Sequence, residues 1–352
     1  MEKNLNIGSE EAVGRTLRAL KTLQDRYQLQ ECFLKDNKCS SDIIEAHSIQ
    51  KNRVLKSISQ DGHIMMFQMT NNDEEATWEP NKIGLKKATV FTGFCKHHDQ
   101  EIFKPIDLYD YEEANEEQEF LFAYKALAKE HHIKLSMTKA YEYILKWTEE
   151  NNLEELKKHY FIKKDDEIAR LHALIPQLKL TLKELKAASR CLNISKDRLN
   201  NNLQHGKYSN LITQTIALRN NYHIACSSCI SLAKDFDGNM INDLTKLNFN
   251  LKYLFLTIFP QNNNTYILLS FFRKDKNTFN FIDTQILNKN EDEQKKLITN
   301  LLLKHVENFT LSPSLWNSME EETRDSISKA FSNNIYFWQT DLKDIEDLNL
   351  FI

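Results

Sequence analysis

Two short segments that carry cysteine and histidine constrain this chain more than any other feature of its sequence. Six residues separate Cys32 from Cys39 in the first segment. The second segment contains Cys95 and His98 with the spacing Cys-x-x-His. A zinc ion takes four nitrogen or sulfur ligands, commonly as two short-spaced pairs separated by a loop or hairpin. We therefore expect Cys32, Cys39, Cys95 and His98 to bind one structural zinc ion. The gap inside the first pair is wider than usual, so the alternative is that these are ordinary core or surface residues.

Composition restricts the class of protein. The chain has 352 residues, 41% of them hydrophobic, and a net charge of −4, which predicts two or three globular domains and argues against indiscriminate coating of nucleic acid. The segment 1–11 lacks the apolar core of a signal peptide, and no run of about 18 apolar residues occurs. Cysteines grouped with histidines fit a reducing compartment. We expect a soluble, cytoplasmic protein without a membrane partner.

The distribution of glycine and proline divides the chain. Gly62, Gly84 and Gly93 lie between the two cysteine segments, whereas no glycine occurs from residue 94 to residue 205. Because glycine and proline interrupt regular structure, the first region is predicted to be rich in turns and the second to be helical. The expected organisation is an N-terminal helix at 1–29, a zinc-binding module at 30–108, a helical region at 109–205 and a C-terminal α+β domain at 206–352.

Local patterns predict the individual elements. Helical spacing indicates a helix at 9–27, several helices across 111–205, and a helix over 166–201 that is interrupted near Pro176. Ser40 and Ser41 are expected to cap a short helix leading to Ala46 and His47. Strands are expected at 62–67, 88–91, 211–218, 222–232, 251–259, 266–272 and 278–282, with further helices at 291–308 and 318–332.

The C-terminal region contains the clearest hairpin pattern. Residues 253–259 and 266–272 are two apolar, β-rich runs, and the polar turn 260–264 separates them. Unbroken apolar strands are usually buried on both faces, so helices should cover this antiparallel sheet. The predicted fold class is α+β.

The order of motifs in residues 30–108 resembles the zinc-stapled, treble-clef form of the ββα-metal (HNH) nuclease module. A cysteine pair precedes Ala46-His47, and a strand-rich stretch then leads to Phe94-Cys95-Lys96-His97-His98-Asp99, which opens a helix. The resemblance implies that His47 is the general base and that Asp99 is a ligand for a catalytic Mg²⁺ or Mn²⁺ ion. Ala46 stands where the family places a further metal ligand, and no asparagine occurs near Phe91 to orient the base.

The resemblance implies a prokaryotic nuclease that acts on DNA, in defence against foreign DNA, with the C-terminal domain recognising a trigger or a protein partner. The alternative is a non-catalytic zinc-binding module for protein interaction. The missing metal ligand at Ala46 and the missing asparagine near Phe91 favour this alternative. Positive charge surrounds the cysteine segments and is suited either to a nucleic-acid backbone or to simple solvation, at Lys82, Lys86, Lys87, Lys96 and Lys104.

Two other patterns have simpler explanations. Cys226 and Cys229 lie three apart on an expected strand, so they should point to opposite faces and be buried thiols instead of a second metal site. The basic stretch within residues 177–198 is suited to nucleic acid or an acidic partner, or is a solvated helix face.

Overall fold

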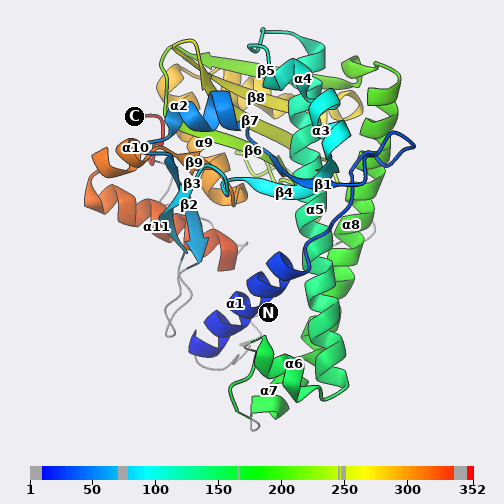
Figure 1. The fold of residues 1–352 in the computed structure, drawn as a ribbon. Coiled ribbons are helices and arrows are strands. Elements are labelled where there is room, and N and C mark those ends of the chain that lie inside the picture. The colour runs from blue at the N-terminus through cyan, green and yellow to red at the C-terminus, as the bar shows by residue number, and fades with distance from the viewer. Residues whose placement is uncertain are drawn as a thin grey trace.

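The computed structural model describes residues 10–69, 78–159, 161–164, 167–244, 246, 251–336 and 347–352. It is a mixed structure in which long helices pack against a large antiparallel sheet (Figure 1). The α+β class expected from the sequence is confirmed. The N-terminal helix α1 (Glu10–Arg26) is also present and packs against α5 (Glu116–Glu149) through Ala19 and Leu23.

Residues 30–108, called the first module below, contain a strand pair followed by two short helices. Strand β1 (Ile43–His47) pairs antiparallel with β4 (Val90–Cys95), and α3 (Lys96–Ile102) and α4 (Lys104–Asp107) come directly after β4. Ile43 lies opposite Cys95, and His47 lies opposite Val90. The short helix expected before His47 is therefore wrong, because pairing with β4 holds these residues extended.

The 42 residues that separate β1 from β4 in the chain form an insertion. It contains a π-helical turn (Lys51–Leu55), α2 (Lys56–Ile58), and the strands β2 (His63–Met69) and β3 (Trp78–Gly84). Residues 70–77, which connect β2 with β3, are outside the described part. The β2–β3 hairpin does not extend the β1–β4 pair but joins the larger sheet.

The central region is dominated by two long helices that run side by side (Figure 1). These are α5 and α8 (Ile175–Gln204), and the shorter α6 (Leu153–Lys158) and α7 (Ile168–Ala173) lie between them in the sequence. The interruption predicted near Pro176 is confirmed, because α7 ends just before Leu174 and α8 begins at Ile175. Pro176 lies in the first turn of α8. The N–H groups of a first turn have no acceptor within the helix, so the missing N–H of proline costs no helical hydrogen bond there.

A seven-stranded antiparallel sheet has the strand order β3-β2-β9-β6-β7-β8-β5. Its other strands are β5 (Leu211–Leu218), β6 (Ile224–Ile230), β7 (Leu254–Gln261), β8 (Asn264–Phe272) and β9 (Thr310–Leu311). The predicted hairpin is present as β7–β8, and its two turn residues, Asn262 and Asn263, both have positive φ. Such a turn matches the right-handed twist of paired strands, and asparagine tolerates it well.

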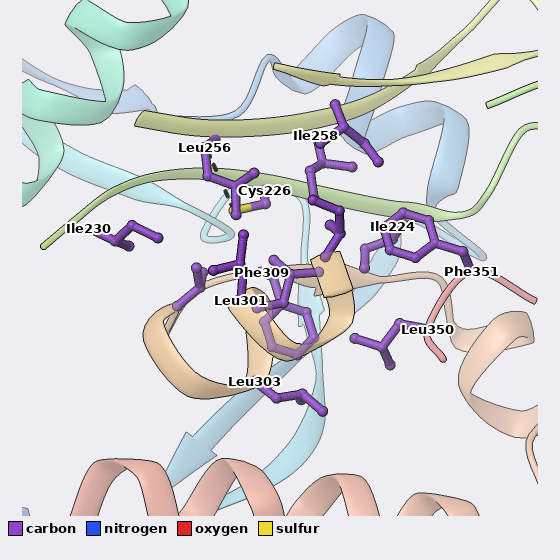
Figure 2. Packing of buried hydrophobic residues seen from close by; sticks show 14 of the residues in the cluster. Ile224, Cys226, Ile230, Leu256, Ile258, Leu301, Leu303, Phe309, Leu350 and Phe351 are labelled. Carbon is purple, nitrogen blue, oxygen red and sulfur yellow. Dashed lines mark hydrogen bonds between the residues drawn. The ribbon is translucent and has the colours of Figure 1, made fainter. Parts of the chain in front are cut away.

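Helices cover both faces of this sheet, as expected. Helix α5 packs on one face, and α9 (Glu291–His305), α10 (Pro313–Ser318) and α11 (Glu321–Tyr336) pack on the other. Figure 2 shows buried side chains of the second face, including Ile224, Cys226, Ile230, Leu256, Ile258, Leu301, Leu303, Phe309, Leu350 and Phe351. Burial of this large apolar surface is the main stabilising contribution to the fold.

The strand expected at 278–282 is wrong. Thr278–Asn280 forms a 3₁₀ turn and Ile282–Leu287 a π-helical turn. Phe279, Ile282 and Ile286 are buried in the same core as the sheet. Their spacing of three and four residues suits one face of a helical turn better than one face of a strand.

The first module and the C-terminal region share the large sheet. Strand β9 lies between β2 and β6, so that Leu311 faces Met65 on one side and Ile224 on the other. Two strands of residues 30–108 thereby belong to a sheet whose remaining strands come from residues 211–311.

Candidate functional site

The segment that carries Cys32 and Cys39 is attached to strand β4. The backbone N–H of Phe33 donates to the carbonyl of Gly93, 2.7 Å away. A side chain at Gly93 would require the Phe91 ring or strand β4 to move, because an added Cβ would lie 2.4 Å from that ring. The loop between the two cysteines is held by Asp36, whose Oδ1 accepts from the N–H of Lys38 at 2.8 Å.

The second pair of ligands comes from the junction of β4 with α3. Cys95 is the N-cap of α3, and its sulfur accepts from the N–H of His98 at 3.5 Å. This cap places His98 in the first turn of the helix, on the side that faces Cys32 and Cys39. Strand β4 and helix α3 therefore carry two ligands to the loop that holds the other two.

The four predicted ligands are brought together. Nδ1 of His98 lies 3.3 Å from Sγ of Cys32, 3.5 Å from Sγ of Cys39 and 3.4 Å from Sγ of Cys95. All four ligand atoms lie within 4.8 Å of one another. With Zn–S near 2.3 Å and Zn–N near 2.0 Å, a tetrahedral ion separates sulfur from nitrogen by about 3.5 Å. The cluster therefore has the donor set and the dimensions to hold a metal ion such as zinc.

A carboxylate outside the ligand set orients His98. Nε2 of His98 lies 3.2 Å from Oδ1 of Asp36. Since a carboxylate accepts, Nε2 carries the proton and Nδ1 keeps its lone pair toward the sulfurs. Sequence reasoning missed Asp36, and its only signal is an acidic residue inside the loop between Cys32 and Cys39.

The pKa values of Cys32, Cys95 and His98 are shifted from their usual values. Burial raises the pKa of the Cys32 thiol to about 12 and lowers the pKa of His98. Burial would raise the pKa of Cys95 as well, but hydrogen bonds from His98 and Ser40 outweigh it and lower that pKa. Because a metal ion binds thiolates, a metal ion bound at these residues would release thiol protons, and its binding free energy would become part of the folding free energy.

His47 is outside the metal cluster, the name used here for the four candidate ligands Cys32, Cys39, Cys95 and His98. It ends β1, and its Nδ1 lies 2.9 Å from the carbonyl oxygen of Ala88. A carbonyl only accepts, so Nδ1 carries the hydrogen and the lone pair is on Nε2. No described residue forms a hydrogen bond with Nε2. Burial, followed by the charges of Lys51 and Lys125, lowers the pKa of His47, so the ring is neutral near pH 7.

Asp99 lies on α3, one residue after His98. Its Oδ1 is buried without a hydrogen-bond partner among the described residues. Burial raises the pKa of Asp99, and the charge of Lys125 opposes that rise. Two hydroxyl groups are also buried without a described partner: that of Ser48, directly after β1, and that of Thr89, directly before β4.

The positive charge of Lys125 acts on the pKa of both His47 and Asp99: it adds to the lowering that burial causes at His47 and opposes the rise that burial causes at Asp99. Lys125 lies on α5, is 4% exposed, and pairs with Asp107 at 3.4 Å. Its ammonium also lies 4.1 Å from the centre of the Phe103 ring. Sequence reasoning missed this residue, although a lysine between Tyr124 and Ala126 in an apolar helical run is a signal for a buried charge.

No second metal-binding set is assembled in the described parts of the chain. There, the only group of three or more histidine, cysteine, aspartate or glutamate ligands within reach of one ion consists of Cys32, Cys39, Cys95 and His98. His47 and Asp99 are therefore not gathered with a third ligand of these types.

The remaining cysteine and lysine patterns are explained by the fold. Cys226 and Cys229 are buried on opposite faces of β6, in separate core clusters, as expected for buried thiols. In the basic stretch of α8, Lys179 and Lys186 pair with Glu149 and Glu142 of α5 at 2.7 Å. The five lysines noted in the sequence around the cysteine segments are exposed and form no ion pair with a described residue: Lys82, Lys86, Lys87, Lys96 and Lys104.

Comparisons with protein-family models, with curated proteins and with solved structures find no significant match for this chain. Among the described helices, none is both long and apolar enough to cross a membrane. The interpretation of the site therefore rests on its own geometry.

Proposed function

We propose that this protein is a nuclease that hydrolyses phosphodiester bonds of DNA at His47, on a ββα module stapled by a structural zinc ion. One observation carries the proposal: the neutral ring of His47 is anchored through Nδ1 to Ala88, which leaves the lone pair of Nε2 unengaged by any described residue. A histidine prepared in this way is suited to accept a proton from water.

The proposed zinc ion has a mechanical role. Its ligands come from the loop before β1, from the end of β4 and from α3. Bound together, they hold the strand that ends in His47 against the helix that carries Asp99. In this proposal the zinc ion does not touch the substrate.

The chemical step is the transfer of a proton from water to Nε2 of His47 while the water oxygen forms a bond to phosphorus. The bond from phosphorus to the leaving oxygen breaks, and that oxygen takes its proton from solvent. In the resembling family an asparagine orients the base, and the carbonyl of Ala88 supplies that orientation here. The absence of asparagine near Phe91 is thus compatible with catalysis.

Asp99 is the residue we propose to bind a catalytic Mg²⁺ or Mn²⁺ ion, which would stabilise negative charge on the phosphate. A buried carboxylate oxygen without a partner suits a hard divalent ion. Ala46 provides no ligand, so the remaining positions would be filled by water and the substrate phosphate.

A nicking assay on supercoiled plasmid tests the proposal, with Mg²⁺, Mn²⁺ or Ni²⁺ added in turn. We expect wild type to nick DNA and His47→Ala to lose at least about a hundredfold in rate, the usual contribution of a general base. His63→Ala is the matched control, because Nδ1 of His63 also meets a backbone carbonyl, that of Asp61 at 2.8 Å, but its ring is exposed outside the site. Intact plasmid with wild type under all conditions, or equal rates for the two variants, contradicts the proposal.

A non-catalytic zinc-binding protein that binds a protein partner through its C-terminal region is the second candidate. The observation that favours it is Lys125, whose ammonium pairs with Asp107 and whose charge opposes the rise in the pKa of Asp99. A site neutralised in this way does not require a metal ion. Under this candidate, wild type is inactive and still holds zinc. A role in defence against foreign DNA rests on the family resemblance alone.

A further inference from the structure

The two edges of the seven-stranded sheet differ in how they are protected. Edge strands expose unpaired N–H and C=O groups, and proteins usually block them with proline, charge or a short strand. The β3 edge follows that rule, because it contains Glu79, Pro80 and Lys82. The β5 edge does not follow it, since Leu211–Leu218 has no proline and no charged residue over eight positions.

The outer side of β5 has no partner in the described part of the chain. Strand β5 pairs only with β8, from Leu211 opposite Phe272 to Leu218 opposite Thr265. No described residue forms a hydrogen bond with the outward backbone groups of β5. Residues 212–215 are half-exposed and Ala217 is exposed, which leaves the edge within reach of another strand.

The sequence of β5 is symmetric about Gln214. Thr213 and Thr215 flank it, and Ile212 and Ile216 flank them in turn. If two copies of β5 pair antiparallel with Gln214 opposite Gln214, threonine faces threonine and isoleucine faces isoleucine. Such cross-strand pairs are favourable, and no like charges are opposed.

We propose that β5 is a homodimerisation edge, on which a second copy of this chain adds its own β5 in antiparallel register about a two-fold axis at Gln214. The interface is isologous, because each residue at position i meets position 428 − i of the other copy, and it therefore closes at two copies. The two seven-stranded sheets become one continuous sheet. The unprotected edge is buried in the assembly, which removes the risk of open-ended aggregation.

Charge placed on the proposed axis gives the sharpest test. In Gln214→Glu or Gln214→Lys, two like charges face each other across the axis, so each variant alone should dimerise at least about tenfold more weakly than wild type, a change of about 1.4 kcal/mol. An equimolar mixture of the two variants should form heterodimers, because opposite charges then meet. Asn81→Lys on the exposed β3 edge is the matched control and should dimerise as wild type does.

The measurement is sedimentation of the full chain from about 1 to 100 µM, the range in which a concentration-dependent dimer is resolved. Amide hydrogen exchange of wild type provides a second readout that needs no variant: the β5 amides should be more protected at the high concentration, and those of β3 should not change. The proposal is overturned by a monomer at every concentration, by β5 protection that does not change over a range in which sedimentation shows dimerisation, or by unaltered dimerisation of both Gln214 variants.

Discussion

His98 and Asp36 form the contact that prepares the metal cluster, with Nε2 of His98 3.2 Å from Oδ1 of Asp36. The contact determines which ring nitrogen is free, and Nδ1 is the nitrogen that faces the three sulfurs. The orientation of the candidate ligand His98 therefore depends on a residue that is not itself in the ligand set.

Replacing Asp36 should weaken metal binding without removing a ligand. We expect Asp36→Asn to reduce zinc affinity about 10-fold to 100-fold, as is usual when the partner of a ligating histidine is lost. Competition with a chromophoric chelator measures the affinity. Asp42→Asn is the control, because the exposed Asp42 side chain lies in the same region and, among the described residues, bonds only Ser41. Equal affinities for the two variants would show that Asp36 does not orient His98.

The zinc content should fall when one of the four candidate ligands is replaced, and it should not fall when a cysteine outside that set is replaced. We expect about one equivalent of zinc per chain in wild type, as one tetrahedral site requires. Cys95→Ser should hold much less and should melt at a lower temperature. Cys191→Ser is the comparison, since Cys191 is a buried thiol on α8 outside the cluster. Wild type with well under one equivalent, measured by elemental analysis, would rule out the zinc site.

Gly93 should not tolerate alanine. The added methyl group would lie 2.4 Å from the Phe91 ring, so strand β4 or the ring must move. We expect Gly93→Ala to lower the free energy of unfolding by about 1 to 3 kcal/mol, as overpacking does. At Gly84 an added Cβ meets only the His63 ring at 3.9 Å, so Gly84→Ala provides a tolerated control.

A smaller neighbour should relieve the strain of that substitution. The double variant Gly93→Ala with Phe91→Leu should be more stable than the sum of the two single effects predicts. Urea denaturation gives the free energies. Strict additivity would mean that the Phe91 ring is not the obstacle.

Acid should destabilise the protein through His132. Burial lowers the pKa of His132 to about 4, and its Nε2 lies 2.9 Å from the carbonyl of Leu29. Because the folded pKa is below the unfolded value of 6.5, this contribution to stability is present above pH 6.5 and decreases as pH falls toward 4. Between pH 7.5 and pH 5 the loss from this residue is about 2 kcal/mol.

Urea denaturation at the two pH values measures that loss. His132→Gln should be less stable at pH 7.5 but should lose about 2 kcal/mol less than wild type on acidification. Other buried histidines contribute to both proteins alike, so the difference isolates His132. Identical losses would show that His132 is protonated as easily in the folded state as in the unfolded chain.

Under the proposed nuclease function, the pH profile of DNA nicking should follow the protonation of His47. Burial lowers the pKa of His47, so the ring remains an unprotonated base somewhat below pH 6.5. The nicking rate should therefore fall on the acid side with a midpoint below 6.5. A midpoint above 6.5 would indicate a different base.

Much of the fold follows from local patterns in the sequence. The strands at 211–218 and 224–230 and the β7–β8 hairpin were predictable because apolar β-rich runs end at turn residues. The break before α8 was predictable because proline interrupts helices. The element at 278–287 was not, because Phe279, Ile282 and Ile286 are apolar in a short segment where strand and helical turn look alike.

The candidate site divides in the same way. The four candidate metal ligands were identifiable because cysteine and histidine in short-spaced pairs are the usual pattern of zinc ligands. Asp36 and Lys125 were not identifiable, since aspartate and lysine are common surface residues and only their position in space distinguishes them. The contact of His47 with Ala88 depends on the pairing of β1 with β4, which are 42 residues apart in the chain.

By itself, the sequence determined the composition of the metal cluster, the apolar strands and the symmetric β5 segment, because each depends on residue type and short spacing. Only the tertiary structure decided that β9 joins the β2–β3 hairpin to the large sheet, and that Lys125 pairs with Asp107 and packs on the Phe103 ring. Contacts of this kind join residues that are distant in the chain. Their free energy comes from burial and pairing across the whole fold, which no local pattern records.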